Sequence, residues 1–332
     1  MQDALTTFPP AHKDRSGAIV AFGVLELLIA LGCVAMICFT LLAVLIRPPA
    51  TSAAMPPGYP PGYPPPAASL AMAALYYLGI AVVFGWLGVG SILARRWART
   101  LSLALGWIWL VSGTVGGLFS LVLLPRIFAA MPQTGGPDIT GVATGCTAVF
   151  VVLCLILLPL AFVLFYRGRN VRATFEARDP HPRWTDRCPF PVLVLALLAA
   201  CVVLPCALSA LHPAFPLFGR LLTGAPGAAV ALLFALLQAA LAWGLYKLRP
   251  AAWWGYLALW LVSVVSSVIT LSRGLNWEEL LRASGQPDNP IFRQVMIGMF
   301  QGPFFVTVLV VLSLAFLGYL LWIKRYFGPA AS

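Results

Sequence analysis

Charged side chains are scarce in this sequence. Only 9% of its 332 residues are charged and 61% are hydrophobic, whereas a soluble domain carries about 25% charged and about 45–50% apolar residues. So few charges exclude a water-soluble fold of this size, because they could not cover its apolar surface. A bilayer accommodates such a chain, since about 20 consecutive apolar residues span it as a helix.

The apolar runs also lack the alternation of apolar and polar residues that membrane β-barrels require. A spanning segment must satisfy its own backbone hydrogen bonds, so the remaining possibility is the helix. We predict an all-α polytopic membrane helix bundle with eight transmembrane helices, at residues 18–46, 70–93, 101–124, 141–166, 190–211, 226–247, 251–272 and 301–323.

Acidic residues are half as frequent as basic ones, at 10 against 21, and the net charge is +11. Fifteen of the 21 basic residues lie in the N-terminal segment, in 94–100, 167–189 and 248–250 with the adjacent Lys247, and in the C-terminal tail. Positively charged loops stay in the cytoplasm. We therefore expect a cell inner-membrane protein with both termini cytoplasmic, which agrees with an even number of spans. Basic residues in short loops beside apolar spans argue against nucleic-acid binding.

Motifs of catalysis and metal binding are missing as well. The seven cysteines form no CxxC pair, and the three histidines are scattered over segments expected on opposite sides of the membrane. The chain contains no Walker A, GxSxG or HExxH motif. We therefore predict no catalytic residues, no metal and no cofactor, and expect that the protein is not an enzyme.

The two halves of the chain resemble each other. Phe22-Gly-Val-Leu matches Phe190-Pro-Val-Leu at an offset of 168, together with two cysteines further along, and Trp109-Leu-Val-Ser matches Trp260-Leu-Val-Ser at an offset of 151. Membrane folds are often built from repeats. With four spans in each repeat, the two copies enter the membrane in the same direction and are parallel.

This duplication sets the predicted domain organisation. It comprises a cytoplasmic segment 1–17, a first four-helix repeat 18–166 with a Pro-rich extracytoplasmic loop 47–69, a basic cytoplasmic linker 167–189, a second repeat 190–323 and a cytoplasmic tail 324–332.

Small residues four apart give a helix a flat face against which another backbone can pack. Such faces occur in the second, third and seventh spans, and we predict helix packing there. A narrow pore lined by small residues is the alternative. The residues are Ala81, Gly85, Ser112, Gly113, Gly116, Gly117, Ser120, Ser263, Ser266, Ser267 and Thr270.

Strongly polar residues are almost absent from the spans. Glu26 in the first span is the one intramembrane charge, and an ionisable residue at such a depth indicates a functional site. Either its carboxyl is hydrogen-bonded to a neighbour, or it has a role toward a proton or cation. Its counterpart in the second half is Val194. Gln238 is the other candidate, and a hydrogen bond between helices is its simpler explanation.

Two loops suggest contacts with other molecules. Loop 47–69 repeats Pro-Pro-Gly-Tyr-Pro around Tyr59 and Tyr63, which is typical of a polyproline II segment. It can serve as a spacer or as a docking ligand for a partner. The linker can bind anionic lipid or a cytoplasmic partner through Arg167, Arg169, Arg172, Arg178, Arg183, Trp184 and Arg187.

The junction of the halves also carries a resemblance. Phe165-Tyr166-Arg167, Val171-Arg172-Ala173-Thr174 and Trp184-Thr185-Asp186-Arg187-Cys188-Pro189 are similar to a signature of bacterial multi-pass membrane proteins. This resemblance implies a membrane fold with a joint between two repeats, and it implies no active site.

Three functions are compatible with these features. The leading hypothesis is a non-catalytic accessory or scaffold subunit of a membrane assembly, with the lipid bilayer and other membrane proteins or further copies of itself as partners. The second is a transporter or channel for a small solute with a path between the repeats. A membrane-embedded enzyme comes third, because the paired ionisable residues that it needs are missing.

Overall fold

The computed structural model describes residues 14–45, 66–130, 140–211, 214–273 and 303–328. These residues contain eight helical rods that are long and apolar enough to span a membrane, which confirms the predicted all-α polytopic bundle. The rods are α1 (Ser16–Leu45), α2 (Pro66–Ile92), α3 (Arg96–Ala130), a composite of α4 (Thr140–Phe150), η1 (Val151–Leu157) and α5 (Leu158–Arg167), and then α7 (Phe190–Ser209), α8 (Gly224–Tyr246), α9 (Pro250–Ser272) and α12 (Pro303–Ile323).

Short elements connect the rods. Between α5 and α7 lie the helix α6 (Arg169–Arg178) and the 3-10 turn η2 (Trp184–Arg187), which form the linker. A two-stranded antiparallel hairpin, β1 (Ala214–Leu217) and β2 (Arg220–Thr223), joins α7 to α8. A second 3-10 turn, η3 (Lys324–Phe327), follows α12. The sequence analysis did not predict this hairpin, which lies between the predicted spans 190–211 and 226–247.

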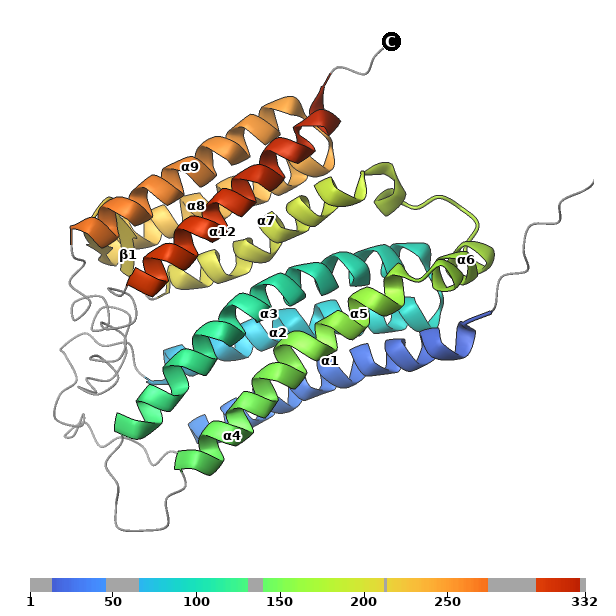
Figure 1. Ribbon diagram of the computed structural model, residues 1–332, viewed down its shortest axis with the longest axis horizontal. Helices are drawn as coiled ribbons and strands as arrows, with labels where there is room; N and C mark the ends of the chain where they lie inside the picture. The colour runs from blue at the N-terminus through green and yellow to red at the C-terminus, as the bar shows by residue number, and fades with distance from the viewer. Residues whose placement is uncertain (1–13, 46–65, 131–139, 212–213, 274–302, 329–332) are drawn as a thin grey trace, which may run out of the picture.

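The rods form two groups that lie side by side (Figure 1). The first half contains α1, α2, α3 and the α4–η1–α5 rod, and the second half contains α7, α8, α9 and α12. In each half the first two helices pack against each other along their length, α1 with α2 and α7 with α8. The halves meet where α7 contacts α2 and α3.

One end of the bundle collects most of the basic residues and is called the basic end below. It contains the start of α1, the α2–α3 turn, the linker, the α8–α9 turn and the end of α12 (Figure 1). The first spanning helix therefore begins, and α12 ends, at the same end of the bundle. The hairpin lies at the opposite end.

The α2–α3 and α8–α9 turns have the same backbone geometry. Each contains a non-glycine residue with positive φ, Ala94 at 49° and Leu248 at 54°. In each, the amide of the following arginine donates to a glycine carbonyl, Arg95 to Gly90 at 2.9 Å and Arg249 to Gly244 at 3.0 Å. The turns therefore correspond at an offset of 154.

This offset corrects the register inferred from the sequence. Both α3 and α9 run on from their turns as continuous helices, so Ser112 is equivalent by position to Ser266 and not to Ser263. The Trp-Leu-Val-Ser strings are three residues out of step, close to one helical turn of about 3.6 residues. The shift keeps similar residues on a similar face, and this explains why the strings suggested the wrong offset.

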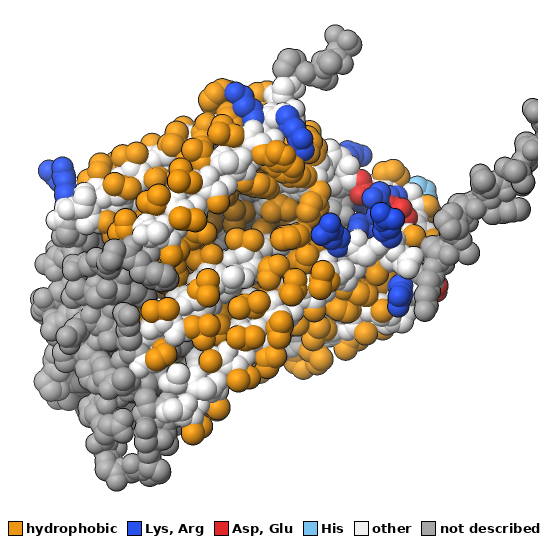
Figure 2. Space-filling view, viewed as in Figure 1, with side chains coloured by type: hydrophobic (Ala, Val, Ile, Leu, Met, Phe, Trp, Pro, Cys, Tyr) orange, Lys and Arg blue, Asp and Glu red, His pale blue; other side chains and the backbone are white. Residues whose placement is uncertain are grey.

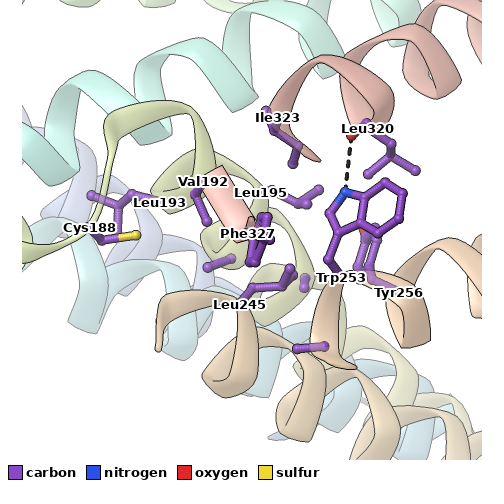
Figure 3. Packing of buried hydrophobic residues seen from close by; sticks show 13 residues of the cluster. Cys188, Val192, Leu193, Leu195, Leu245, Trp253, Tyr256, Leu320, Ile323 and Phe327 are labelled. Carbon is purple, nitrogen blue, oxygen red and sulfur yellow. Dashed lines mark hydrogen bonds between the residues drawn. The ribbon is translucent and has the colours of Figure 1, made fainter. Parts of the chain in front are cut away.

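Aromatic and aliphatic side chains close the second half at its basic end (Figure 3). The indole of Trp253 is 2% exposed and donates to the carbonyl of Leu320 at 3.0 Å, which joins α9 to α12. Tyr319 donates to the carbonyl of Pro191 at 2.5 Å and joins α12 to α7. Leu245 and Phe327 complete this core.

Candidate functional site

The carboxyl group of Glu26 lies inside the first half and is 0% exposed. The hydroxyl of Ser102 donates to its Oε1 at 2.6 Å, and the hydroxyl of Tyr166 donates to the same oxygen at 3.1 Å. Ser91 is hydrogen-bonded to the Tyr166 hydroxyl at 2.9 Å. We call Glu26, Ser91, Ser102 and Tyr166 the polar cluster.

Each member of the polar cluster comes from a different rod: Glu26 from α1, Ser91 from the end of α2, Ser102 from the start of α3 and Tyr166 from the end of α5. All four are at most 2% exposed. Within the described residues, Oε2 of Glu26 has no hydrogen-bond partner. The cluster thus fastens four helices to one another and retains one free acceptor oxygen.

The described residues of the second half contain no equivalent of this cluster. At the offset of 154 set by the turns, Ser91 corresponds to Leu245 and Ser102 to Tyr256, while the first-span offset of 168 pairs Glu26 with Val194. Leu245 is 0% exposed, as Ser91 is. The buried positions of Ser91 and Ser102 thus correspond to buried apolar or aromatic residues in the second half.

The linker covers the polar cluster at the basic end. Phe175 of α6 is 0% exposed, and its ring centroid lies 6.3 Å from that of Tyr166. The backbone amide of Arg15 donates to Thr174 at 3.2 Å, which joins α6 to the start of α1. Below Tyr166, Phe22 stacks on Phe165 with ring centroids 3.8 Å apart. Phe22, Phe165 and Phe175 thus pack around the ring of Tyr166.

Contacts with Arg96 hold the linker on the start of α3. Asp179 is 3% exposed at its side chain, is paired with Arg183 at 2.7 Å and accepts the backbone amide of Arg96 at 3.2 Å. Glu176 pairs with Arg172 at 2.8 Å and with Arg96 at 3.5 Å. The hydrogen bond from Arg183 lowers the pKa of Asp179, and that from Arg172 lowers the pKa of Glu176.

The predicted contact residues of the linker fall into two groups. Arg172 and Arg183 are used in the ion pairs within the linker. Trp184 is 40% exposed, and its ring packs edge-on against Tyr246 of the second half at 5.8 Å. The remaining arginines are exposed and form no ion pair in the part of the chain that the structure describes: Arg167, Arg169, Arg178 and Arg187.

Cys188 lies where the linker enters α7. It is 5% exposed, and burial raises the pKa of its thiol to about 11. A thiol with such a pKa is almost entirely protonated at neutral pH and reacts slowly. This position therefore contributes to packing.

The small residues of α3 divide between two faces. A Cβ on Gly113 would collide with the carbonyl oxygen of Leu155 in η1, and one on Gly117 would lie 3.0 Å from Val151. Pro159 lacks an N–H, so the Leu155 carbonyl four residues earlier loses its α-helical donor, and η1 is a π-helical segment at this point. Gly113 therefore lets α3 approach a distorted stretch of the fourth rod closely.

The second face of α3 does not pack in this way. The hydroxyls of Ser112 and Ser120 donate to their own helix, to Ile108 at 2.7 Å and to Gly116 at 2.8 Å. A Cβ on Gly116 would meet no atom within 4 Å. This face is open in the structure.

The small residues of α9 hold the hairpin instead of another helix. Ser266 accepts the backbone amide of Phe218 at 3.0 Å, and Thr270 accepts that of Gly219 at 2.9 Å. Ser263 donates to its own helix at Leu259, and Ser267 is exposed. The prediction of helix packing missed this role, because the hairpin was not foreseen.

The other predicted site residues are spread over the fold. Gln238 is 7% exposed in α8, and its Oε1 has no hydrogen-bond partner among the described residues. Ala81 of α2 is 8% exposed, and Gly85 lies against α1, where an added Cβ would be 3.9 Å from that of Ala30. Tyr59 and Tyr63 lie outside the described residues.

Sequence reasoning missed three of the four residues of the polar cluster. Ser91 and Ser102 are single hydroxyls in apolar helices, and nothing in their spacing links them to Glu26. Tyr166 belongs to the Phe165-Tyr166-Arg167 string of the junction signature, which was the only pointer to it. The cluster depends on the order in which the four rods pack.

Comparisons of this chain with protein-family models, with curated proteins and with solved structures found no match. Among the described residues, no group of three or more His, Cys, Asp or Glu side chains could hold a metal ion. The fold and the site define the class: a multi-pass integral membrane protein whose described residues contain eight apolar helices and a polar cluster inside the first half.

Proposed function

We propose that this protein is a non-catalytic scaffold or accessory subunit of a membrane assembly in a bacterial inner membrane, with its basic end in the cytoplasm. One observation carries the proposal: the single carboxyl group inside the described spans is 0% exposed, and its bonds join helices of the same chain. A catalytic acid or base must reach a reacting group, and this carboxyl group is fully buried within the first half.

The matching turns support the further proposal that the chain is a duplicated four-helix unit with parallel repeats. Two turns of the same rare geometry, each with a non-glycine residue at positive φ, occur at corresponding places in the two halves. Such residues are uncommon in proteins. The two repeats then differ at the polar cluster, which the described residues contain in the first repeat alone.

The exposed linker arginines and Trp184 offer a contact surface for an assembly partner. Arg and Trp are enriched at the energetically important positions of protein interfaces. Purification of the full-length protein in mild detergent is expected to recover a stoichiometric partner or a homo-oligomer. A variant with Gln at Arg167, Arg169, Arg178 and Arg187 should release it, whereas Gln at Arg220 and Arg273 of the opposite end should not. A lone monomer in every detergent would contradict a scaffold role.

A transporter of a small solute is the second candidate, and the free Oε2 of Glu26 favours it. A buried acceptor without a donor is costly, and a proton or a small cation would satisfy it. This candidate predicts that Glu26→Gln or Gln238→Leu changes solute flux in proteoliposomes. Unchanged flux in both variants would remove a transport role for these two side chains and leave the scaffold.

A further inference from the structure

The basic end of the second half carries four cations that form no ion pair with any described residue: Lys247, Arg249, Lys324 and Arg325. The described residues of this half, 190–211, 214–273 and 303–328, contain no Asp or Glu. Figure 2 shows the contrast, because Lys and Arg appear alone at the end of the second half, whereas Asp and Glu lie beside them at the linker. The counter-charge for these four residues must come from outside this part of the chain.

Aromatic rings hold three of these cations in place. The ammonium group of Lys247 lies 4.8 Å from the ring centroid of Trp243, and that of Lys324 lies 4.9 Å from Trp254. The guanidinium of Arg325 lies 4.5 Å from the ring of Trp322. A cation over a ring face is attracted to it and loses freedom before any ligand arrives, so a later ligand orders fewer side chains.

The rings lie where the spans end. Trp243 is near the end of the span Gly224–Tyr246, Trp254 near the start of Pro250–Ser272 and Trp322 near the end of Phe305–Phe327. Their exposed fractions are 59%, 56% and 47%. Exposed tryptophans at the ends of spans lie at the headgroup level of a bilayer. The cations are therefore placed at the depth of lipid phosphates.

We infer that this surface is a binding site for the phosphate headgroups of anionic phospholipids. The site, called the rim site, consists of Lys247, Arg249, Lys324 and Arg325 with the rings of Trp243, Trp254 and Trp322. The headgroup phosphate supplies the missing counter-charge, and the acyl chains lie against the apolar helices below the rings. The inference does not depend on whether the protein is a scaffold or a transporter.

Two features favour lipid over free phosphate or an acidic protein. The first is depth, because the rings that hold the cations end membrane spans. The second is the spread of the cations over two separate segments, the α8–α9 turn and the end of α12. A row of headgroups can meet all of them at once, and each basic residue near an anionic membrane surface adds to the affinity.

The test is a lipid titration of the full-length protein in neutral detergent, with bound phosphatidylglycerol counted by native mass spectrometry and phosphatidylcholine as the reference lipid. The rim variant Lys247→Gln/Lys324→Gln is compared with the linker variant Arg172→Gln/Arg183→Gln, which removes the same charge from cations that already have acidic partners. We expect the rim variant to bind phosphatidylglycerol roughly 30-fold more weakly, from about 1 kcal/mol for each basic residue, and the linker variant to bind it as the natural protein does.

A charge-keeping variant, Lys247→Arg/Lys324→Arg, should restore binding and shows that loss in the rim variant is not misfolding. Equal weakening in the rim and linker variants would overturn the inference, since a general attraction by net charge would then account for it. Displacement of phosphatidylglycerol by inorganic phosphate at matched concentration would also overturn it, because the site would then recognise the anion without its lipid. Unchanged binding in the rim variant would overturn it directly.

Discussion

At the residue scale, the burial of the Glu26 carboxyl group depends on the hydrogen-bond donors around it. A carboxyl group in a membrane bundle loses its hydration, so it must be hydrogen-bonded within the protein. Ser102 and Tyr166 provide these bonds, both to Oε1. Because the donors come from α3 and α5, the carboxyl group of one helix fixes the positions of two others. A substitution of Glu26 therefore affects the packing of three helices, α1, α3 and α5.

Replacement of Glu26 by Ala is expected to destabilise the fold. The hydroxyls of Ser102 and Tyr166 would be left buried without their acceptor, at a cost of about 1–3 kcal/mol. Glu26→Gln keeps an acceptor oxygen at Oε1 and should cost less. Unfolding of the full-length protein with SDS in mixed micelles measures both variants, and equal losses would contradict the role given to Oε1.

Replacement of Gly113 by Ala tests the close contact between α3 and η1. The new methyl group meets the Leu155 carbonyl, so either the helices separate or the carbonyl moves, and overpacking of this kind costs about 1–3 kcal/mol. Gly116→Ala is the matched control, because nothing lies within 4 Å of the added Cβ and Ala is the better helix former. Thermal unfolding in mild detergent should show a lower midpoint for the first variant only.

At the element scale, apolar and ionic contacts dock the linker on the basic end of the first half. α6 contributes Phe175 and Val171 to the core, at 0% and 5% exposed, and its acids bind Arg96 at the start of α3. Helix termini leave backbone N–H groups free, and the carboxylate of Asp179 satisfies one of them at the backbone amide of Arg96. The linker is thus docked by both apolar and ionic contacts.

The ionic part of this docking should depend on pH. The pKa values of Glu176 and Asp179 are lowered from the ordinary 4.5 and 3.8 by the arginines that bind them. Their contribution to docking is complete above those ordinary values and is lost as the pH falls through the lowered ones. The NMR signal of fluorotryptophan at position 184, assigned with Trp184→Phe, should shift in this acid range.

Asp179→Asn is the control for this prediction. This substitution removes the more deeply buried of the two acids, so the change of the Trp184 signal at acid pH should be smaller. At neutral pH, the signal of the variant should lie closer to the position that the natural protein shows at low pH. A transition of unchanged size and midpoint in this variant would show that another group causes it.

At the scale of the whole molecule, the charge distribution and the number of spans both bear on how the chain is oriented in the membrane. The described residues contain eight rods, of which the first begins and the last ends at the same end of the bundle (Figure 1). The segments at that end contain most of the basic residues of the sequence. The halves are joined mainly through α7 with α2 and α3. An orientation signal at one end therefore sets the topology of both halves.

The expected topology can be measured with reporters at the two ends of the chain. Tags on the N- and C-termini of the full-length protein should both be protected from protease added to intact spheroplasts, and both should be cleaved after lysis. Cysteine labelling at Arg220→Cys, on the hairpin, is the control and should succeed in intact cells. Tags on opposite faces would contradict the eight-span bundle.

Local sequence alone determined the number and approximate positions of the spans, because length and apolar character suffice to place a helix in a bilayer. It also pointed to Glu26, since a carboxylate in an apolar run stands out. It could not find Ser91, Ser102 or Tyr166 as partners, or the roles of Ser266 and Thr270 at the hairpin. These residues are 48 or more positions away from the groups they bind.

Only the tertiary structure decided which helices are neighbours and in what register. Hydrophobic character drives every span into lipid equally and carries no information on which spans pack together, because lipid tails are as apolar as leucine. Packing order, hydrogen bonds and close backbone contacts make that choice. They bring one carboxyl group and three hydroxyls together in the first half. The positions of the second half that correspond to Ser91 and Ser102 are Leu245 and Tyr256.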